Sequence, residues 1–271
     1  MVNQNNERYN LGMKKIYKYK GGEWIDLYSP TQNEVREAAL IAGVDPSAVD
    51  ELLSPSLRHK IQFNDNHAYI VLHFPAFKES ERGDAAYEVD FILTKNVIIT
   101  THYEKIDAIE SFQKTEENEN GIFFGILGEL LTNFEHKLSS VDHWIREIEN
   151  KMFSGKEKQT IIELSEVARH LIDFRKITAV YPDVFQTMAD EGGKLFGKKF
   201  TDLAKETIER FEKSRNKLEI LADTARELRE TNNSLLSTEQ NQTMKTLTVV
   251  TVLATIVVGI ALIWIGLQTI K

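Results

Sequence analysis

The chain has 271 residues, of which 42% are hydrophobic and 27% charged, and its formal net charge is −8. This length allows one or two soluble domains and a membrane span, while the acidic balance argues against nucleic acid as a partner, because phosphate binding needs clustered Lys and Arg. The sequence contains no cysteine, which excludes disulfides, thiolate metal sites and cysteine nucleophiles.

Residues 1–12 are polar, lack the apolar core of a signal peptide and are expected to be disordered. Residues 13–120 predict an α+β domain of αβα type, because their uncharged strand-like runs favour a sheet covered by helices. The strand-like runs are Met13–Tyr19, Trp24–Leu27, Lys60–Phe63, Ala68–Phe77, Tyr87–Leu93 and Val97–His102. After the second run, Thr31 and Glu34 form a capping box that starts a helix. Pro46 is placed to begin another helix.

Over residues 121–196 the sequence predicts an antiparallel pair of helices. Apolar side chains recur at steps of three and four over 123–153, which is the pattern of an amphipathic helix. Gly155 is expected to end that helix. The returning helix is expected over 158–190, with a kink or a break at Pro182.

Residues 197–243 predict a stalk helix. Neither glycine nor proline occurs in the 61 residues 198–258, so one helix of about 90 Å can run into the membrane. Two columns with seven-residue spacing indicate the seam of a coiled coil. The columns are Phe211, Leu218, Ala225 and Asn232, and Leu221, Leu228 and Leu235. Packing within one chain explains part of this seam, but its continuation into a membrane span favours a parallel homo-oligomer with the three leucines near its axis.

Residues 244–270 predict a transmembrane helix, because the 25 residues 246–270 carry no charge and a helix of this length crosses a hydrocarbon core of about 30 Å. At about 100° per residue its polar side chains gather on one stripe. The stripe consists of Met244, Thr248, Thr251, Thr255, Leu262 and Gly266. Contact with sister helices or with a water-filled path explains this clustering. The alternative is that the threonine hydroxyls bond back to their own helix and merely tolerate the bilayer.

Three other patterns predict no further site. Residues 192–199 imitate a phosphate-binding loop, but Lys199 replaces the required Ser or Thr and a helix precedes the segment. His136 and His143 share a helix face, and such pairs are more often packing or surface residues than metal ligands. No Ser/His/Asp set stands in a catalytic context, so the sequence does not indicate an enzyme.

Several segments resemble the CorA family of magnesium and cobalt channels. In the N-terminal region they are Trp24-Ile25-Asp26-Leu27, Val44-Asp45-Pro46, Leu52-Leu53, Ala68-Tyr69-Ile70-Val71-Leu72 and Phe91-Ile92-Leu93-Thr94-Lys95-Asn96. In the helical region they are Phe134-Glu135, Ile145, Ile148, Leu171, Arg175-Lys176 and Asn241-Gln242-Thr243-Met244-Lys245-Thr246-Leu247-Thr248. The resemblance implies a cytoplasmic αβα domain, a long stalk helix that becomes the pore-lining span, and a homopentamer.

The sequence departs from the family's pattern in the membrane. CorA proteins end the first span with Gly-Met-Asn, whereas an ungapped match from Met244 places Ile265-Gly266-Leu267 at that position. The family's second span and its basic C-terminal tail are missing from this sequence. These departures bear directly on ion selectivity.

The resemblance also implies a regulatory metal site, formed by a stalk acid and an acid on a neighbouring subunit's loop. The stalk position corresponds to Glu206 or Glu209. The loop position falls on Lys78, with Glu79 and Glu81 beside it. Mg²⁺ prefers oxygen ligands and a lysine repels it, so the alternative is that these stalk acids form a solvated helix face.

The favoured hypothesis is a CorA-like homopentameric channel or transporter that passes Mg²⁺ or another divalent cation passively and is gated by the cytoplasmic domain. Because Mg²⁺ sheds water reluctantly, a pore lined by threonine and asparagine would carry the ion with its waters. The expected pore and gate residues are Asn241, Met244, Leu247, Thr248, Thr251 and Thr255, with the Met and Leu side chains as the apolar constriction and the asparagine as a polar ring below it. The chain would be a single-pass protein of the cell (inner) membrane, with its own copies and the lipid bilayer as partners. The alternative is a CorA-like regulatory or effector membrane protein without selective Mg²⁺ conduction.

Overall fold

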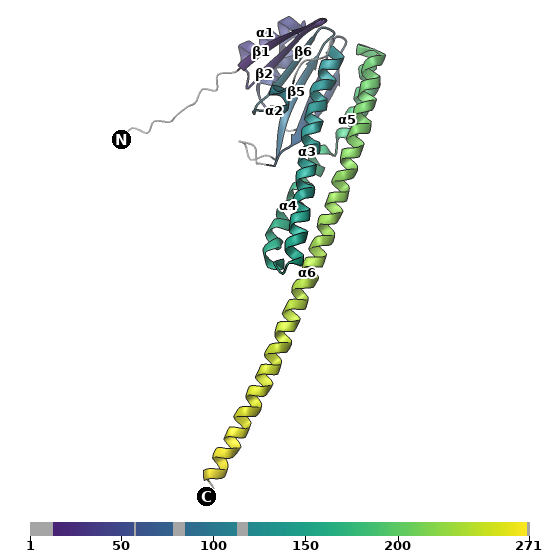
Figure 1. Ribbon diagram of the computed structural model, residues 1–271. Helices are drawn as coiled ribbons and strands as arrows, with labels where there is room; N and C mark the ends of the chain where they lie inside the picture. The colour runs from purple at the N-terminus through teal and green to yellow at the C-terminus, as the bar shows by residue number, and fades with distance from the viewer. Residues whose placement is uncertain (1–12, 57, 78–84, 113–118, 270–271) are drawn as a thin grey trace, which may run out of the picture. The chain divides into compact units, whose positions relative to one another are not determined.

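The computed structural model describes residues 13–56, 58–77, 85–112 and 119–269 (Figure 1). The expectation of a disordered segment at 1–12 therefore falls outside the described residues. The chain forms two compact units, one built from 1–142 and 169–222 and the other from 143–168 and 223–271. The sequence-based segments 13–120, 121–196 and 197–243 divide the chain differently, because three long helices each pass from one unit into the other.

The first unit contains a six-stranded mixed sheet in the order β1-β2-β6-β5-β4-β3. Its strands are β1 Met13–Tyr19, β2 Gly22–Tyr28, β3 Lys60–Phe63, β4 Ala68–Pro75, β5 Ala86–Leu93 and β6 Val97–His102. Neighbouring strands are antiparallel except for β2 and β6, which run parallel with Asp26 opposite Thr100. All six strands predicted from the sequence are confirmed, and their ends shift by two residues or fewer.

The described chain also contains helical segments. They are α1 Gln32–Ala42, the 3-10 helix η1 Pro46–Leu53, α2 Asp107–Glu110, α3 Glu119–Phe153, α4 Glu157–Thr178, α5 Tyr181–Phe196 and α6 Lys198–Thr269. The capping box is confirmed, since the Thr31 hydroxyl accepts from the Glu34 amide while the Glu34 carboxylate accepts from the Thr31 amide. Pro182 sits in the first turn of α5 and divides the predicted returning helix in two, as expected for a residue that fits only the start of a helix.

One face of the sheet is covered by α1 and η1. The buried core on this side combines Tyr69 with aliphatic side chains from the four central strands and both helices, among them Ile25, Leu27, Val35, Ala38, Val49, Leu52, Val71, Ile92 and Ile99. On the sheet's other face, Phe91 packs edge-on against Phe123 of α3 while Phe74 packs against Tyr181 of α5. The sheet is therefore the middle layer of an αβα domain, and the predicted α+β architecture is confirmed.

Two adjacent glycines allow α5 and α6 to pack closely. A Cβ atom added at Gly192 would lie 2.2 Å from the Phe200 ring, and one added at Gly193 would lie 2.1 Å from the Thr201 hydroxyl. Both glycines lie within α5 rather than in a loop. The glycines that imitate a phosphate-binding loop thus serve the contact between two helices.

The second unit is a packed set of helix segments from α3, α4 and α6. Thr160 of α4 is fully buried and its hydroxyl donates to the Asn232 side chain of α6 at 3.2 Å. Two ion pairs surround this contact, Lys151 with Glu163 and Lys158 with Glu239, each at 2.9 Å. The C-terminal part of α6 in this unit is long and apolar enough to cross a membrane, and none of its most apolar window is buried by the chain.

Candidate functional site

The candidate ion path is one face of α6. The helix is uninterrupted from Lys198 to Thr269 (Figure 1), so residues spaced by three, four and seven positions lie on one side of it. Met244, Thr248, Thr251 and Thr255 follow this spacing, and all four side chains are exposed. These four members of the predicted stripe therefore lie on one face that the described part of the chain leaves uncovered.

The threonine hydroxyls of this face are tied to their own helix. Those of Thr248, Thr251 and Thr255 donate to the carbonyl oxygens four residues earlier, each at 2.8 Å. This is the back-bonding that the alternative interpretation of the stripe expects. A hydroxyl that donates one hydrogen bond keeps acceptor lone pairs, so these oxygens can still accept hydrogen bonds from water.

The predicted constriction is apolar and exposed. Met244 and Leu247 are 66% and 60% exposed, and Asn241, three residues before Met244, is exposed as well. Beyond the stripe, the backbone remains helical through 265–267, the positions that correspond to Gly-Met-Asn in the resemblance.

The heptad columns have a different role from the one predicted. Leu221 and Leu228 are only 4% and 8% exposed in a single chain, and Asn232 is buried too, while Leu235 is half-buried. Side chains already covered by their own chain cannot form the centre of an oligomer. The expectation that Leu221 and Leu228 lie at the oligomer axis is therefore wrong, and packing within one chain explains the seam.

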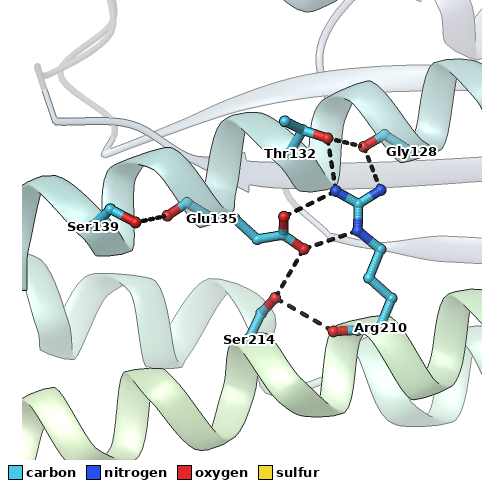
Figure 2. A network of polar contacts seen from close by, with 6 residues as sticks. All are labelled: Gly128, Thr132, Glu135, Ser139, Arg210 and Ser214. Carbon is cyan, nitrogen blue, oxygen red and sulfur yellow. Dashed lines mark hydrogen bonds and ion pairs between the residues drawn. The ribbon is translucent and has the colours of Figure 1, made fainter.

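A clamp built on Arg210 joins α6 to α3 in the first unit (Figure 2). Its guanidinium donates from Nε and Nη2 to the two carboxylate oxygens of Glu135, at 2.8 and 2.9 Å. Further hydrogen bonds reach the Thr132 hydroxyl at 2.6 Å and the Gly128 carbonyl at 3.0 Å. Ser214 donates to the same carboxylate at 3.4 Å. The fork geometry of this pair fixes the two helices in position as well as in distance.

The electrostatics of the clamp follow from this geometry. Hydrogen bonding from Arg210 lowers the pKa of Glu135, against the opposing effect of partial burial, so the carboxylate is charged at neutral pH. Sequence analysis missed the clamp, although Glu135 lies in one of the segments that carry the family resemblance. An arginine and a glutamate 75 positions apart give no local pattern, and only the helix packing brings them together.

The stalk acids lie beside this clamp. Glu206 lines a cavity of about 210 Å³ between α3 and α6, together with Lys199, Thr207 and Arg210, and Glu209 is exposed on the following turn. Within the described ranges, no group of three or more His, Asp or Glu side chains could hold a metal ion. Lys78, Glu79 and Glu81 lie outside the described residues.

A second polar cluster is buried in the sheet. Tyr103 donates to Asp90 at 3.1 Å, and Glu88 accepts from the Ser56 amide and lies 2.9 Å from His73. Burial raises the pKa of Asp90 well above its usual range, and the nearby charge of Glu88 raises it further. Asp90 therefore holds a proton at neutral pH. This cluster was not found from the sequence.

Comparison with known proteins gives the family. Residues 19–260 match the family described as CorA-like Mg²⁺ transporter protein. The chain belongs to the CorA family. It is 22% identical over 247 residues to the cobalt/magnesium transport protein CorA of Thermotoga maritima, covering 86% of this chain and 68% of that protein. The corresponding CorA of Methanocaldococcus jannaschii is 23% identical over 242 residues, covering 84% of this chain and 74% of that protein.

Solved structures share the CorA fold seen here. The complete structure of the CorA magnesium transporter from M. jannaschii superposes with a TM-score of 0.72 at 19% identity, covering 85% of this chain and 75% of that one. The full-length CmaX protein gives the same TM-score at 14% identity, covering 85% and 73%. The αβα domain, the stalk and the apolar C-terminal helix of this chain are thus CorA-like, and the family is one of membrane ion transporters.

Proposed function

We propose that this chain assembles as a homopentamer in the cell (inner) membrane and passively conducts Mg²⁺ or another divalent cation, with its N-terminal domain in the cytoplasm. The observation that carries the proposal is the continuous, uncovered stripe of Met244, Thr248, Thr251 and Thr255 on α6. In lipid, a stripe of this kind is best placed against sister helices and a wet axis. Family membership and the cobalt/magnesium transport names of the two CorA relatives support a divalent cation as the cargo.

The chemistry of the stripe suits a hydrated ion. Water bound to Mg²⁺ presents hydrogen atoms outward, and the ion dehydrates reluctantly. The threonine oxygens already donate to their own helix, so they meet those waters as acceptors. Asn241 offers an amide oxygen of the same kind at the cytoplasmic end. The pore is therefore a path of acceptors for water-coated cations rather than a cage of direct ligands.

The gate in this proposal is the ring of Met244 and Leu247. Apolar side chains brought close together exclude water and stop a hydrated ion. Because α6 continues from this ring into the first unit without a break, movement of the stalk can reach the gate directly. The Arg210 clamp ties the upper end of the same helix to α3. Gating by the cytoplasmic domain would act through this connection.

A second candidate function is a regulatory or effector membrane protein that does not conduct selectively. Two observations favour it. The sequence carries Ile265-Gly266-Leu267 where the family pattern has Gly-Met-Asn, and the threonine hydroxyls need no partner outside their own helix.

Ion flux in proteoliposomes separates the two candidates. The mass of the purified protein is first measured in detergent, where a pentamer is expected. The protein is then reconstituted in vesicles that contain a fluorescent Mg²⁺ indicator. Replacing Met244 by Ser should wet the constriction and raise Mg²⁺ entry several-fold, while the matched change Val250→Ser on another face should leave it unchanged. A monomer, or equal and unaltered flux for both variants, contradicts the channel proposal.

Cysteine labelling tests the wet axis independently of flux. The chain has no native cysteine, so Thr251→Cys and Leu253→Cys each carry a single thiol. A small water-soluble thiol reagent should modify the first variant quickly and the second hardly at all, because thiolate chemistry needs water. Equal modification of the two would mean that the stripe serves packing and that the scaffold candidate is correct.

A further inference from the structure

The turn between α3 and α4 is a fixed structure with an apolar tip. Gly155 adopts φ +78, and the Lys156 amide donates back to the Lys151 carbonyl at 3.2 Å. Ser154 also caps the helix end, its hydroxyl donating to the Asn150 carbonyl at 2.6 Å. Capping of this kind holds the last residues of α3 in one orientation.

Phe153, the last residue of α3, points away from the protein. It is 65% exposed, whereas its neighbour Met152 is completely buried. Successive residues of a helix differ by about 100° in direction, so burial of the methionine turns the phenylalanine outward. The described part of the chain therefore leaves this large aromatic side chain uncovered at a turn of fixed geometry.

The turn lies close to the point where α6 enters the bilayer. The contacts Thr160 to Asn232 and Lys158 to Glu239 place the start of α4 beside α6 in the same unit. From Glu239 to the first uncharged residue after Lys245 is seven residues, or about 10 Å of helix. A headgroup layer of about 5–7 Å occupies much of that distance. The remaining few ångströms are less than the length of a Phe or Lys side chain.

Most charged side chains at the turn form ion pairs within the protein. Lys151 and Lys158 are held by Glu163 and Glu239. In the described part of the chain Lys156 is exposed and has no ion-pair partner, and Glu157 follows it at the start of α4. Lysine beside an exposed aromatic ring is the combination found at membrane interfaces, where the amine reaches phosphate and the ring enters the acyl boundary.

We propose that Phe153 and Lys156 at the α3–α4 turn bind the phospholipid headgroup layer of the bilayer that α6 crosses. The ring supplies most of the contact and the amine pairs with lipid phosphate. Because Glu157 offsets the charge of Lys156, the contact forms on zwitterionic lipid and is strengthened moderately by anionic lipid. The proposal depends on the membrane span and is independent of whether the chain conducts ions.

A spin label tests this contact in the full chain. Ser154→Cys places a nitroxide at the turn and leaves both proposed residues in place, and Ile162→Cys, which is 69% exposed on α4 in the same unit, serves as the matched control farther from the bilayer. Each variant is reconstituted in phosphatidylcholine vesicles that contain lipid with a nickel-chelating headgroup. Nickel should relax the label at 154 several-fold more than the label at 162.

Second variants assign the contact to the two residues. Phe153→Ser should reduce the nickel effect at 154, because the ring no longer holds the turn against the headgroup layer, and Lys156→Gln should cancel the increase seen when phosphatidylglycerol is added. Both changes are on the surface, so the melting temperature should stay constant. Equal relaxation at 154 and 162 overturns the proposal. So does spin–spin broadening at 154 with no nickel effect, since the turn would then face another copy of the chain.

Discussion

The two halves of α6 have opposite relations to the rest of the chain. Up to Asn232 the helix is covered at regular intervals by the protein's own helices, and beyond Asn232 none of its described side chains is buried. Both halves have a periodic pattern of side chains. The difference shows that helical periodicity reveals which face needs a partner but not whether that partner is the same chain, another copy or lipid.

The largest effect is expected in the covered half. Leu228→Ala should lower the free energy of unfolding by about 2–4 kcal/mol, because it opens a cavity under a buried side chain. Leu253→Ala in the uncovered half should leave the unfolding of the soluble part unchanged. Denaturant unfolding followed by circular dichroism in detergent measures both variants. Equal losses would contradict the division of α6 into two halves.

The Arg210 clamp should contribute less. Arg210→Met removes four hydrogen bonds and leaves Glu135 without its cation, but both side chains are about one-third exposed. We expect a loss of about 1–2 kcal/mol. Arg226→Met, which breaks an exposed pair with Asp223, is the control and should cost less than about 0.5 kcal/mol. Equal losses for the two variants would show that the clamp holds α3 and α6 no better than a surface pair.

Change of pH should act on the sheet and leave the membrane-spanning part of the uncovered half unaffected, since residues 246–270 carry no charge. The raised pKa of Asp90 means that the folded state keeps a proton that the unfolded state has lost. Stability should therefore decline as pH rises above the unfolded pKa near 4 towards the folded pKa, by at most about 1.4 kcal/mol per pH unit for one group.

His102 adds to this slope in the same direction. Burial alone lowers its pKa, but the nearby Asp26 carboxylate, 3.4 Å from Nε2, and the Glu104 carbonyl, 2.6 Å from Nδ1, outweigh burial and raise the pKa. The stability gained from the charge of His102 is therefore lost as pH rises through the folded pKa. Thermal melting between pH 5 and 9 should show a smaller slope for Asp90→Asn than for Asp107→Asn, an exposed control. An unchanged slope in Asp90→Asn would show that the buried proton is absent.

The smallest effect is expected from Mg²⁺ on the soluble region. With Lys78 at the family's loop position and no three-residue acidic or histidine cluster among the described residues, millimolar Mg²⁺ should change the melting temperature by no more than the scatter between repeats. Glu206→Ala and Glu209→Ala should behave like the parent chain. A rise of many degrees that either variant abolishes would establish a regulatory site.

Local patterns predicted most of the fold. The strands, the Thr31 cap and the break at Pro182 depend on residues near in sequence, and each is confirmed. The 3-10 geometry of η1 and the short α2 were not predicted, since both are set by packing rather than by a periodic pattern.

The candidate site was only partly predictable. The stripe on α6 follows from spacing alone, so its exposed face could be anticipated. The packing partner of Leu221 and Leu228 could not be predicted, because a column with seven-residue spacing looks the same whether α3 and α4 or a sister helix covers it. The pairing of Arg210 with Glu135 depends on a tertiary contact. Glu88 and Asp90 share one face of β5, but their burial depends on how the sheet is packed.

The hydroxyl-to-carbonyl bonds of Thr248, Thr251 and Thr255 also bear on biogenesis. A membrane span enters the bilayer one chain at a time, and a polar group without a partner resists that step. Here each of the three hydroxyls already has a hydrogen-bond acceptor in its own helix. A newly made chain can therefore insert before it meets another copy, and assembly can follow insertion as a separate event.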